Sequence, residues 1–139
     1  MFRRLAIAAA LCAAACTNST CDTGVVDVSE LCLPAPASPG LPLVVDVRES
    51  CGRGCSGVPS CTALLRNAQI TLTVEQDVCQ ETLTQECINR ACEQRVVPCQ
   101  LPALNEGDYV VSAPGSALRL LHVQSGGSST CRLVADGGV

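Results

Sequence analysis

The sequence of 139 residues contains no lysine and no tryptophan, and it has only one phenylalanine, one tyrosine and one histidine. The absence of lysine excludes Schiff-base catalysis and the Ser-x-x-Lys motif. Proteins that bind nucleic acid need a basic face and, for single strands, stacking aromatic residues, whereas the formal net charge here is −4. We therefore expect no nucleic-acid partner, and the shortage of aromatic residues also argues against a carbohydrate-binding platform.

The most apolar run of the chain spans residues 5–15 and follows the basic residues Arg3 and Arg4. Eleven residues of helix rise about 16 Å, roughly half the thickness of a hydrocarbon core, so this run is too short to span a membrane. A basic start followed by a short apolar run that ends in small residues is typical of a signal peptide. We therefore expect residues 1–15 to direct export.

Residues 13–16 read Ala-Ala-Ala-Cys, which resembles the lipobox of bacterial lipoproteins. The resemblance implies cleavage before Cys16, lipid on Cys16 and a membrane anchor. The next residue is Thr17 rather than the Asp that usually retains such proteins at the inner membrane, so we expect an outer-membrane lipoprotein of the cell envelope. The family prefers Leu where this chain has Ala13, which leaves a secreted or periplasmic protein as the alternative.

Twelve residues are cysteine, a density typical of exported domains that disulfides hold together. Cys12 lies in the expected signal peptide and Cys16 would carry the lipid, so neither is available for pairing. An even number of cysteines then remains, and the sequence does not choose among their possible pairings. The ten expected disulfide-forming residues are Cys21, Cys32, Cys51, Cys55, Cys61, Cys79, Cys87, Cys92, Cys99 and Cys131.

The chain that remains after residue 15 carries seven arginines against thirteen acidic residues, and Tyr109 is its sole aromatic residue. Aromatic side chains normally bury the largest areas, so the core has to be built from Val, Leu, Ile and Ala. Disulfides, worth about 2–4 kcal/mol each, are expected to supplement this small core.

Alternating apolar and polar residues dominate the sequence after residue 42, and this period of two predicts β-strands. In the clearest run, 70–75, Leu72 should be buried and its neighbours Thr71 and Thr73 should be much less so. Strands are expected at 24–30, 43–48, 70–75, 95–101, 108–113 and 118–123, and one helical turn at 80–90.

The expected fold is all-β: a small, disulfide-rich, antiparallel β-sandwich behind the N-terminal signal peptide. In the run 43–48, Asp46 and Arg48 alternate with apolar residues and should face solvent. Recurring prolines at 34–42 predict a stiff connector. The expected division is a signal peptide at 1–15, a lipid-anchored tether and proline-rich connector at 16–42, and the sandwich at 43–139.

Residues 101–111 read Leu-Pro-Ala-Leu-Asn-Glu-Gly-Asp-Tyr-Val-Val. With an insertion between Leu104 and Gly107, this segment resembles the L-P-x-G-x-Y-x-V signature of transthyretin-like and collagen-adhesin B-type sandwich domains. The resemblance implies a turn followed by a late strand, with Tyr109 packed at the corner of a sheet, and it transfers no catalytic residue. Independently of it, Gly107 permits an unusual turn conformation and Tyr109 favours a strand.

Two places in the sequence offer candidate functional residues. Cys51 and Cys55 enclose Arg53 among glycines, which predicts a loop fixed by disulfides and, as an alternative, an inhibitor loop that presents Arg53 to a protease. His122 is the only histidine, so a Ser-His-Asp or Cys-His mechanism would have to use it. A partly exposed histidine on a strand is the simpler interpretation.

Glu75 and Asp77 fall on one face of the strand expected around them, a spacing compatible with acid-base chemistry or calcium binding. Solvated carboxylates at the end of a strand are the simpler interpretation. The chain contains no C-x-x-C, H-E-x-x-H or G-x-S-x-G motif, and exported thiols oxidise. We therefore expect no metal site and no cofactor.

These features together predict a non-enzymatic structural or binding module that lipid at Cys16 holds on a membrane, with an envelope protein as a further candidate partner. Two alternatives stay open. One is a secreted protease inhibitor that presents Arg53, and the other is a small hydrolase that uses His122.

We predict that all ten cysteines from Cys21 to Cys131 are oxidised in the exported protein, because its aromatic-poor core depends on them. Alkylation of the unreduced protein, read out by intact mass, should label none of the ten, and reduction should unfold the domain. Four labelled thiols together with bound zinc would instead indicate a metal site.

Overall fold

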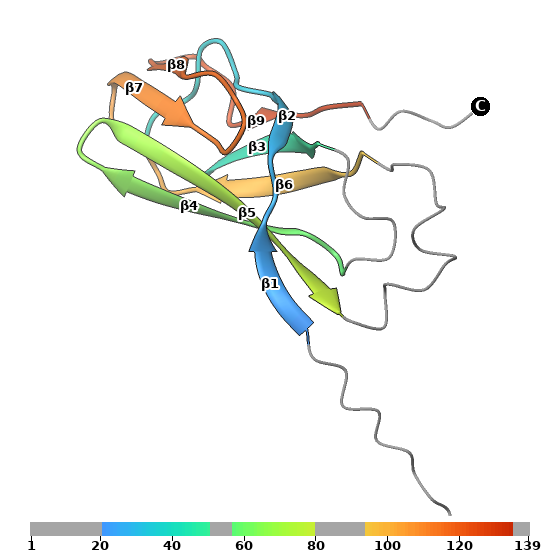
Figure 1. The fold of residues 1–139 in the computed structure, drawn as a ribbon. Coiled ribbons are helices and arrows are strands. Elements are labelled where there is room, and N and C mark those ends of the chain that lie inside the picture. The colour runs from blue at the N-terminus through green and yellow to red at the C-terminus, as the bar shows by residue number, and fades with distance from the viewer. Residues whose placement is uncertain (1–20, 51–56, 80–93, 135–139) are drawn as a thin grey trace, which may run out of the picture.

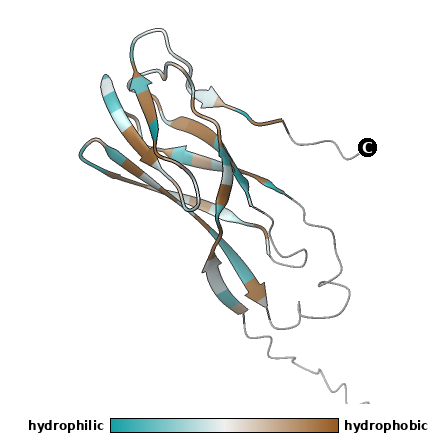
Figure 2. Ribbon diagram, turned by 45° about the horizontal axis from the view of Figure 1, so that its top comes forward, coloured by the Kyte–Doolittle hydropathy of each residue, from teal (hydrophilic) through white to brown (hydrophobic). Residues whose placement is uncertain are grey.

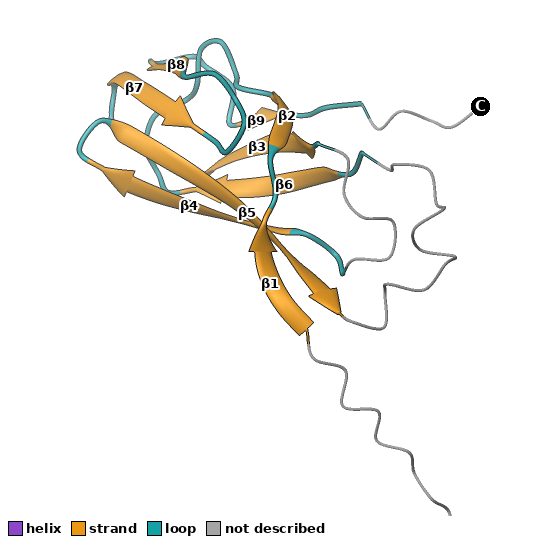
Figure 3. Cartoon of the chain, viewed as in Figure 1, coloured by secondary structure: helices purple, strands orange, loops and turns teal. Residues whose placement is uncertain are grey.

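The computed structural model describes residues 21–50, 57–79 and 94–134, and every regular element in these ranges is a β-strand (Figure 1, Figure 3). The strands form two sheets, which confirms the expected all-β sandwich. Several predicted features lie outside the described residues, namely the signal peptide, Cys16, the loop around Arg53 and the helical turn at 80–90.

The two sheets differ in size. Sheet A has five strands, with the order β1 (Cys21–Val25), β5 (Gln69–Cys79), β7 (Gly107–Ser112) and β8 (Arg119–Val123), and with β4 (Ser60–Arg66) also paired to β5. Sheet B has four strands, with the order β2 (Val28–Leu31), β3 (Leu43–Glu49) and β6 (Val96–Leu101), and with β9 (Thr130–Cys131) also paired to β3. Neighbouring strands are antiparallel except for β5 with β7 and β3 with β9, which are parallel.

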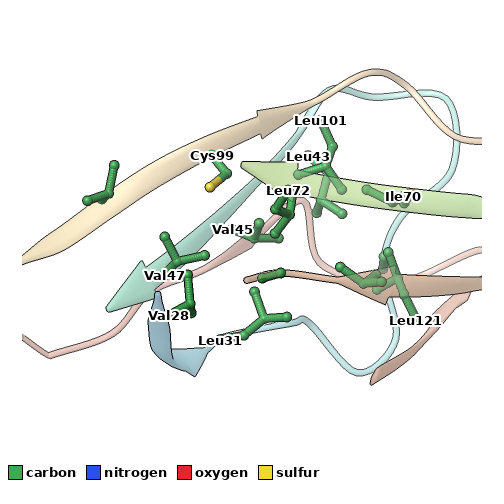
Figure 4. Packing of buried hydrophobic residues seen from close by; sticks show 14 of the residues in the cluster. Val28, Leu31, Leu43, Val45, Val47, Ile70, Leu72, Cys99, Leu101 and Leu121 are labelled. Carbon is green, nitrogen blue, oxygen red and sulfur yellow. The ribbon is translucent and has the colours of Figure 1, made fainter. Parts of the chain in front are cut away.

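The alternation along β5 builds the centre of the core. Leu72 has no exposed area, whereas Thr71 is exposed and Thr73 is only half-buried, as predicted. Figure 2 shows hydrophobic and hydrophilic residues alternating along the strands, and Figure 4 shows Leu72 among aliphatic side chains of both sheets. The largest fully buried apolar residues are Leu, Ile and Val, and Tyr109 packs against this cluster while remaining partly exposed.

Each predicted run contains a strand, but the run at 24–30 is divided between the two sheets. Its first part belongs to β1 in sheet A and its second part to β2 in sheet B. Two strands, β4 and the short β9, lie outside the predicted runs, although exposed and half-buried residues alternate along the whole of β4.

The prediction that Asp46 and Arg48 face solvent is wrong, because these residues are only 3% and 7% exposed. The segment after β9 covers this face of β3. Arg132 Nη1 lies 3.2 Å from Asp46 Oδ1, and the Leu133 N–H donates to Asp46 Oδ2 at 3.1 Å. Arg48 Nη2 donates to the Val134 carbonyl at 2.8 Å. The strand β3 is therefore buried on both faces.

The proline-rich segment packs into the sandwich and is not a connector that precedes it. Ala37 has no exposed area, its N–H donates to the His122 carbonyl at 2.8 Å, and its carbonyl accepts from the Gln124 N–H at 2.9 Å. A Cβ on Gly127 would lie 2.3 Å from the backbone carbonyl of Ala37, so this close approach requires glycine. Residues 21–42 therefore belong to the same packed unit as the strands that follow them.

Two disulfides tie distant parts of the chain together. Cys61–Cys99 joins β4 of sheet A to β6 of sheet B, with Cα atoms 5.1 Å apart. Cys32–Cys131 joins the residue after β2 to β9, with Cα atoms 5.5 Å apart. Cys21 is also disulfide-bonded. Other expected disulfide-forming residues lie outside the described part of the chain, namely Cys51, Cys55, Cys87, Cys92 and the side chain of Cys79.

The turn before β7 follows the sequence expectation. Gly107 adopts a φ of +144°, a value that favours glycine, and the Tyr109 hydroxyl donates to the Asn105 carbonyl at 3.2 Å. A tyrosine that bonds back to the backbone just upstream is the tyrosine corner seen in antiparallel sandwiches. The resemblance to transthyretin-like and collagen-adhesin B-type domains stays a prediction.

We predict that Leu72→Ala lowers the free energy of unfolding by about 2–5 kcal/mol, because it leaves a cavity in the core. Leu64→Ala is the matched control, since Leu64 points away from the core on the neighbouring strand and is 53% exposed. This control should cost less than about 1 kcal/mol. Denaturant unfolding of both variants measures the difference, and equal losses would contradict the assigned faces of the two strands.

Candidate functional site

The candidate site lies on the outer face of sheet A, the face turned away from the core. On β8, Leu121 and Val123 enter the core, so Leu120 and His122 point to the outer face. The antiparallel register of β7 and β8 sets Asp108 opposite His122. His122 Nδ1 contacts Asp108 Oδ1, and both side chains are more than half exposed.

The proline-rich segment forms a second wall beside β8. The hydrogen bonds of Ala37 to the end of β8 hold the segment there, and the Ser128 N–H donates to the Pro36 carbonyl at 3.0 Å. The peptide bond between Ala35 and Pro36 is cis. Between this segment and β8 lies a pocket of about 380 Å³, which is lined by Pro34, Ala35, Pro36, Leu120, His122 and Gln124.

The pocket combines apolar walls with two polar groups, and its volume falls in the range of about 300–1,000 Å³ typical of small-molecule sites. The contact with Asp108 occupies His122 Nδ1, so Nε2 is the ring nitrogen left for a ligand. Gln124 lines the same pocket. No residue that lines the pocket has a hydroxyl or thiol. The pocket thus offers groups for binding and lacks the nucleophile that a Ser-His-Asp or Cys-His centre requires.

A buried polar cluster lies between the sheets at the end of β3. Glu49 has no exposed area, and its Oε1 lies 2.7 Å from Arg95 Nε. Arg95 Nη1 and Gln76 Nε2 both donate to the Gly57 carbonyl, at 3.2 and 3.1 Å. Glu49 Oε2 is buried and has no hydrogen-bond partner among the residues that the structure describes. This cluster fixes Gly57 against both sheets, so its role in the described residues is structural.

The acidic residues singled out on β5 do not form a site with other ligands. Asp77 accepts a hydrogen bond from Thr23 Oγ1 at 2.7 Å, and Glu75 is half-buried on the same strand. Across 21–50, 57–79 and 94–134, no group of three or more His, Cys, Asp or Glu residues is placed to hold a metal ion. Both carboxylates therefore remain single side chains on the outer face.

Sequence reasoning identified His122 but missed its pairing with Asp108. The signal was present, because the predicted strands at 108–113 and 118–123 flank a turn, and a hairpin of these strands sets the two residues near each other. The register that brings them directly opposite comes only from the structure. The structure joins His122 to the proline-rich segment as well, which the sequence did not indicate.

The chain matches no family model, and no curated protein or solved structure is significantly similar to it. No helix long and apolar enough to cross a membrane occurs in the part of the chain that the structure describes. The site therefore has to be interpreted from its own geometry.

We predict that Arg95→Met lowers the free energy of unfolding by about 3 kcal/mol, because it leaves the carboxylate of Glu49 buried without its ion pair. Arg119→Met is the matched control, since Arg119 is exposed on β8 and forms no ion pair with the described residues. It should change stability by less than about 0.5 kcal/mol. Denaturant unfolding would contradict the prediction if both variants were as stable as the unchanged protein.

Proposed function

We propose that this chain is a lipid-anchored protein of the bacterial cell envelope whose sandwich acts as a non-enzymatic binding module. The observation that carries the proposal is the N-terminal sequence, in which Arg3 and Arg4 precede an apolar run and three alanines precede Cys16. The disulfides Cys32–Cys131 and Cys61–Cys99 support export, because such bonds form and persist in oxidising compartments.

The short spacing between Cys16 and the sandwich supports a fixed position near the membrane. Residues 17–20 span at most about 14 Å when extended, so lipid on Cys16 holds the start of β1 close to the bilayer. Cys21 is in register with Cys79 at one end of β5, while Gln69 at the other end is in register with Val110 of β7. Since β5 is about 35 Å long, β7 and β8 lie away from the anchored end (Figure 1).

The His122 pocket therefore lies at the end of the sandwich far from Cys21, where an envelope partner can reach it. A pocket with apolar walls, one imidazole and one amide supports recognition of a ligand. The alternative of a hydrolase that uses His122 lacks a nucleophile in the pocket lining, and the alternative of an inhibitor that uses Arg53 concerns a residue outside the described ranges. Binding is therefore the function that the geometry supports best.

We predict that the mature protein begins at Cys16, carries acyl chains and sediments with outer membranes. More than one acyl chain is needed for a durable anchor, at about 0.8 kcal/mol for each buried CH₂ group. Expression of the full chain in a diderm bacterium, followed by intact-mass measurement and membrane fractionation, tests this.

The matched pair for this experiment is Cys16→Ser and Cys12→Ala. The first variant should lose the acyl mass and appear as soluble or unprocessed protein, whereas the second alters only the expected signal peptide and should be processed normally. A mature protein without acyl mass, or one that begins at another residue, would contradict the proposal.

A further inference from the structure

The outer edge of β4 is open. This strand pairs with β5 along its whole length without a register shift, and no described backbone hydrogen bond reaches its other side. The residues of β4 that face inward are only half-buried, whereas Ile70 and Leu72, which face inward on β5, are fully buried. Solvent therefore reaches the edge of sheet A along β4, which Figure 1 shows paired on one side with β5.

The backbone groups that face this open edge follow from the register. Glu75 is in register with Val25 of β1 and with Ser60 of β4, so β1 and β4 lie on opposite sides of β5. The Val74 carbonyl accepts from the Val26 N–H and so faces the β1 side. The N–H and C=O groups of successive residues in a strand point to alternate sides of it. Those of Glu75 therefore face β4, and those of Ser60, which is opposite Glu75, face β5. Within 21–50, 57–79 and 94–134, the N–H and C=O groups of β4 that have no partner are therefore those of Cys61, Ala63 and Leu65.

The edge strands of the two sheets differ in how they are protected against pairing with another strand. Natural edge strands are usually blocked by proline, charged residues or a bulge. In sheet B, the Asp46 carbonyl accepts a hydrogen bond from the Cys32 N–H, so the backbone groups of Asp46 face β2. Pro98 of β6 is in register with Asp46. The backbone nitrogen of Pro98 therefore points away from β3, toward the open edge of β6. Proline has no N–H, and it therefore blocks that edge. The strand β4 contains no proline, and Arg66 at its end is its only charged residue.

We propose that this edge pairs with the same edge of a second copy, so that the two copies of sheet A form one continuous antiparallel sheet. A twofold axis at Ala63 sets Cys61 opposite Leu65 of the second copy, and every unpaired backbone group of these residues then gains a partner. The same register sets Ser60 opposite Arg66 of the second copy, so no like charges face each other.

Charge complementarity favours a second copy over other extended segments. Ser60, Arg66 and Glu75 all lie on the outer face of sheet A. In the paired arrangement, Arg66 of one copy extends over the short side chain of Ser60 toward Glu75 of the other, two strands or about 10 Å away. The twofold axis repeats this contact on the other side of the interface.

The contact between Arg66 and Glu75 cannot form within one copy. Arg66 is in register with Gln69, and Glu75 lies six positions further along β5, a distance of about 20 Å. Exchange of the two charges therefore tests the interface without altering an ion pair of the single chain.

The test measures the dissociation constant of the dimer for the full chain in detergent, by sedimentation velocity over a range of concentrations. Arg66→Glu and Glu75→Arg should each raise this constant about tenfold or more, because each turns two attractive contacts into two repulsive ones. The double variant Arg66→Glu/Glu75→Arg should return the constant to that of the unchanged protein. Arg119→Glu, on the far side of sheet A, should leave it unchanged.

A second variant tests the backbone pairing. Ala63→Pro removes an N–H that faces the open edge and makes no hydrogen bond to the described residues, so the variant should keep its β-sheet circular dichroism and become monomeric. Should this variant fail to fold, the charge exchange decides by itself. Three results would overturn the proposal: an unchanged protein that stays monomeric at every concentration, a dimer that tolerates a folded Ala63→Pro variant, or single charge reversals without effect.

Discussion

The Cys61–Cys99 disulfide joins the edge strands of the two sheets. The fully buried apolar residues of the core beside it are all aliphatic except for cysteine. In the loop-entropy view, disulfides that close 38 and 99 residues destabilise the unfolded chain by roughly 4 and 5 kcal/mol. The net stability of a small domain is only about 5–15 kcal/mol. The two disulfides thus contribute an amount comparable to the whole net stability of such a domain.

The second disulfide, Cys32–Cys131, holds the end of the described chain over the outer face of sheet B. There Arg48 Nε lies 3.0 Å from Glu30 Oε2, and Asp46 is bonded by groups of the segment after β9. Buried charges need partners of this kind, since an unpaired one costs several kcal/mol. The ion pairs and the disulfide therefore hold the same segment in place, and this segment covers Asp46 and Arg48.

The pocket beside β8 and the candidate contact along β4 both belong to sheet A. Exposed apolar side chains on the outer face of this sheet come from β4, β7 and β8, namely Leu64, Val110 and Leu120. The His122 pocket lies at the β8 edge, and the unprotected edge of β4 lies at the other. The candidate ligand site and the candidate contact between copies therefore lie at opposite edges of the same sheet.

The sequence by itself determined most of the strands, the burial of Leu72 and the expectation of disulfides, because a period of two and a high density of cysteine are local or compositional properties. It also indicated His122 as the only histidine, but not the pocket around it. It did not indicate β4 or β9. Only the tertiary structure decided that Asp46 and Arg48 are buried, that Cys61 pairs with Cys99, and that Ala37 packs against β8. The physical reason is distance along the chain, since each of these features depends on residues at least 38 positions away and on the register of strands that no local pattern specifies.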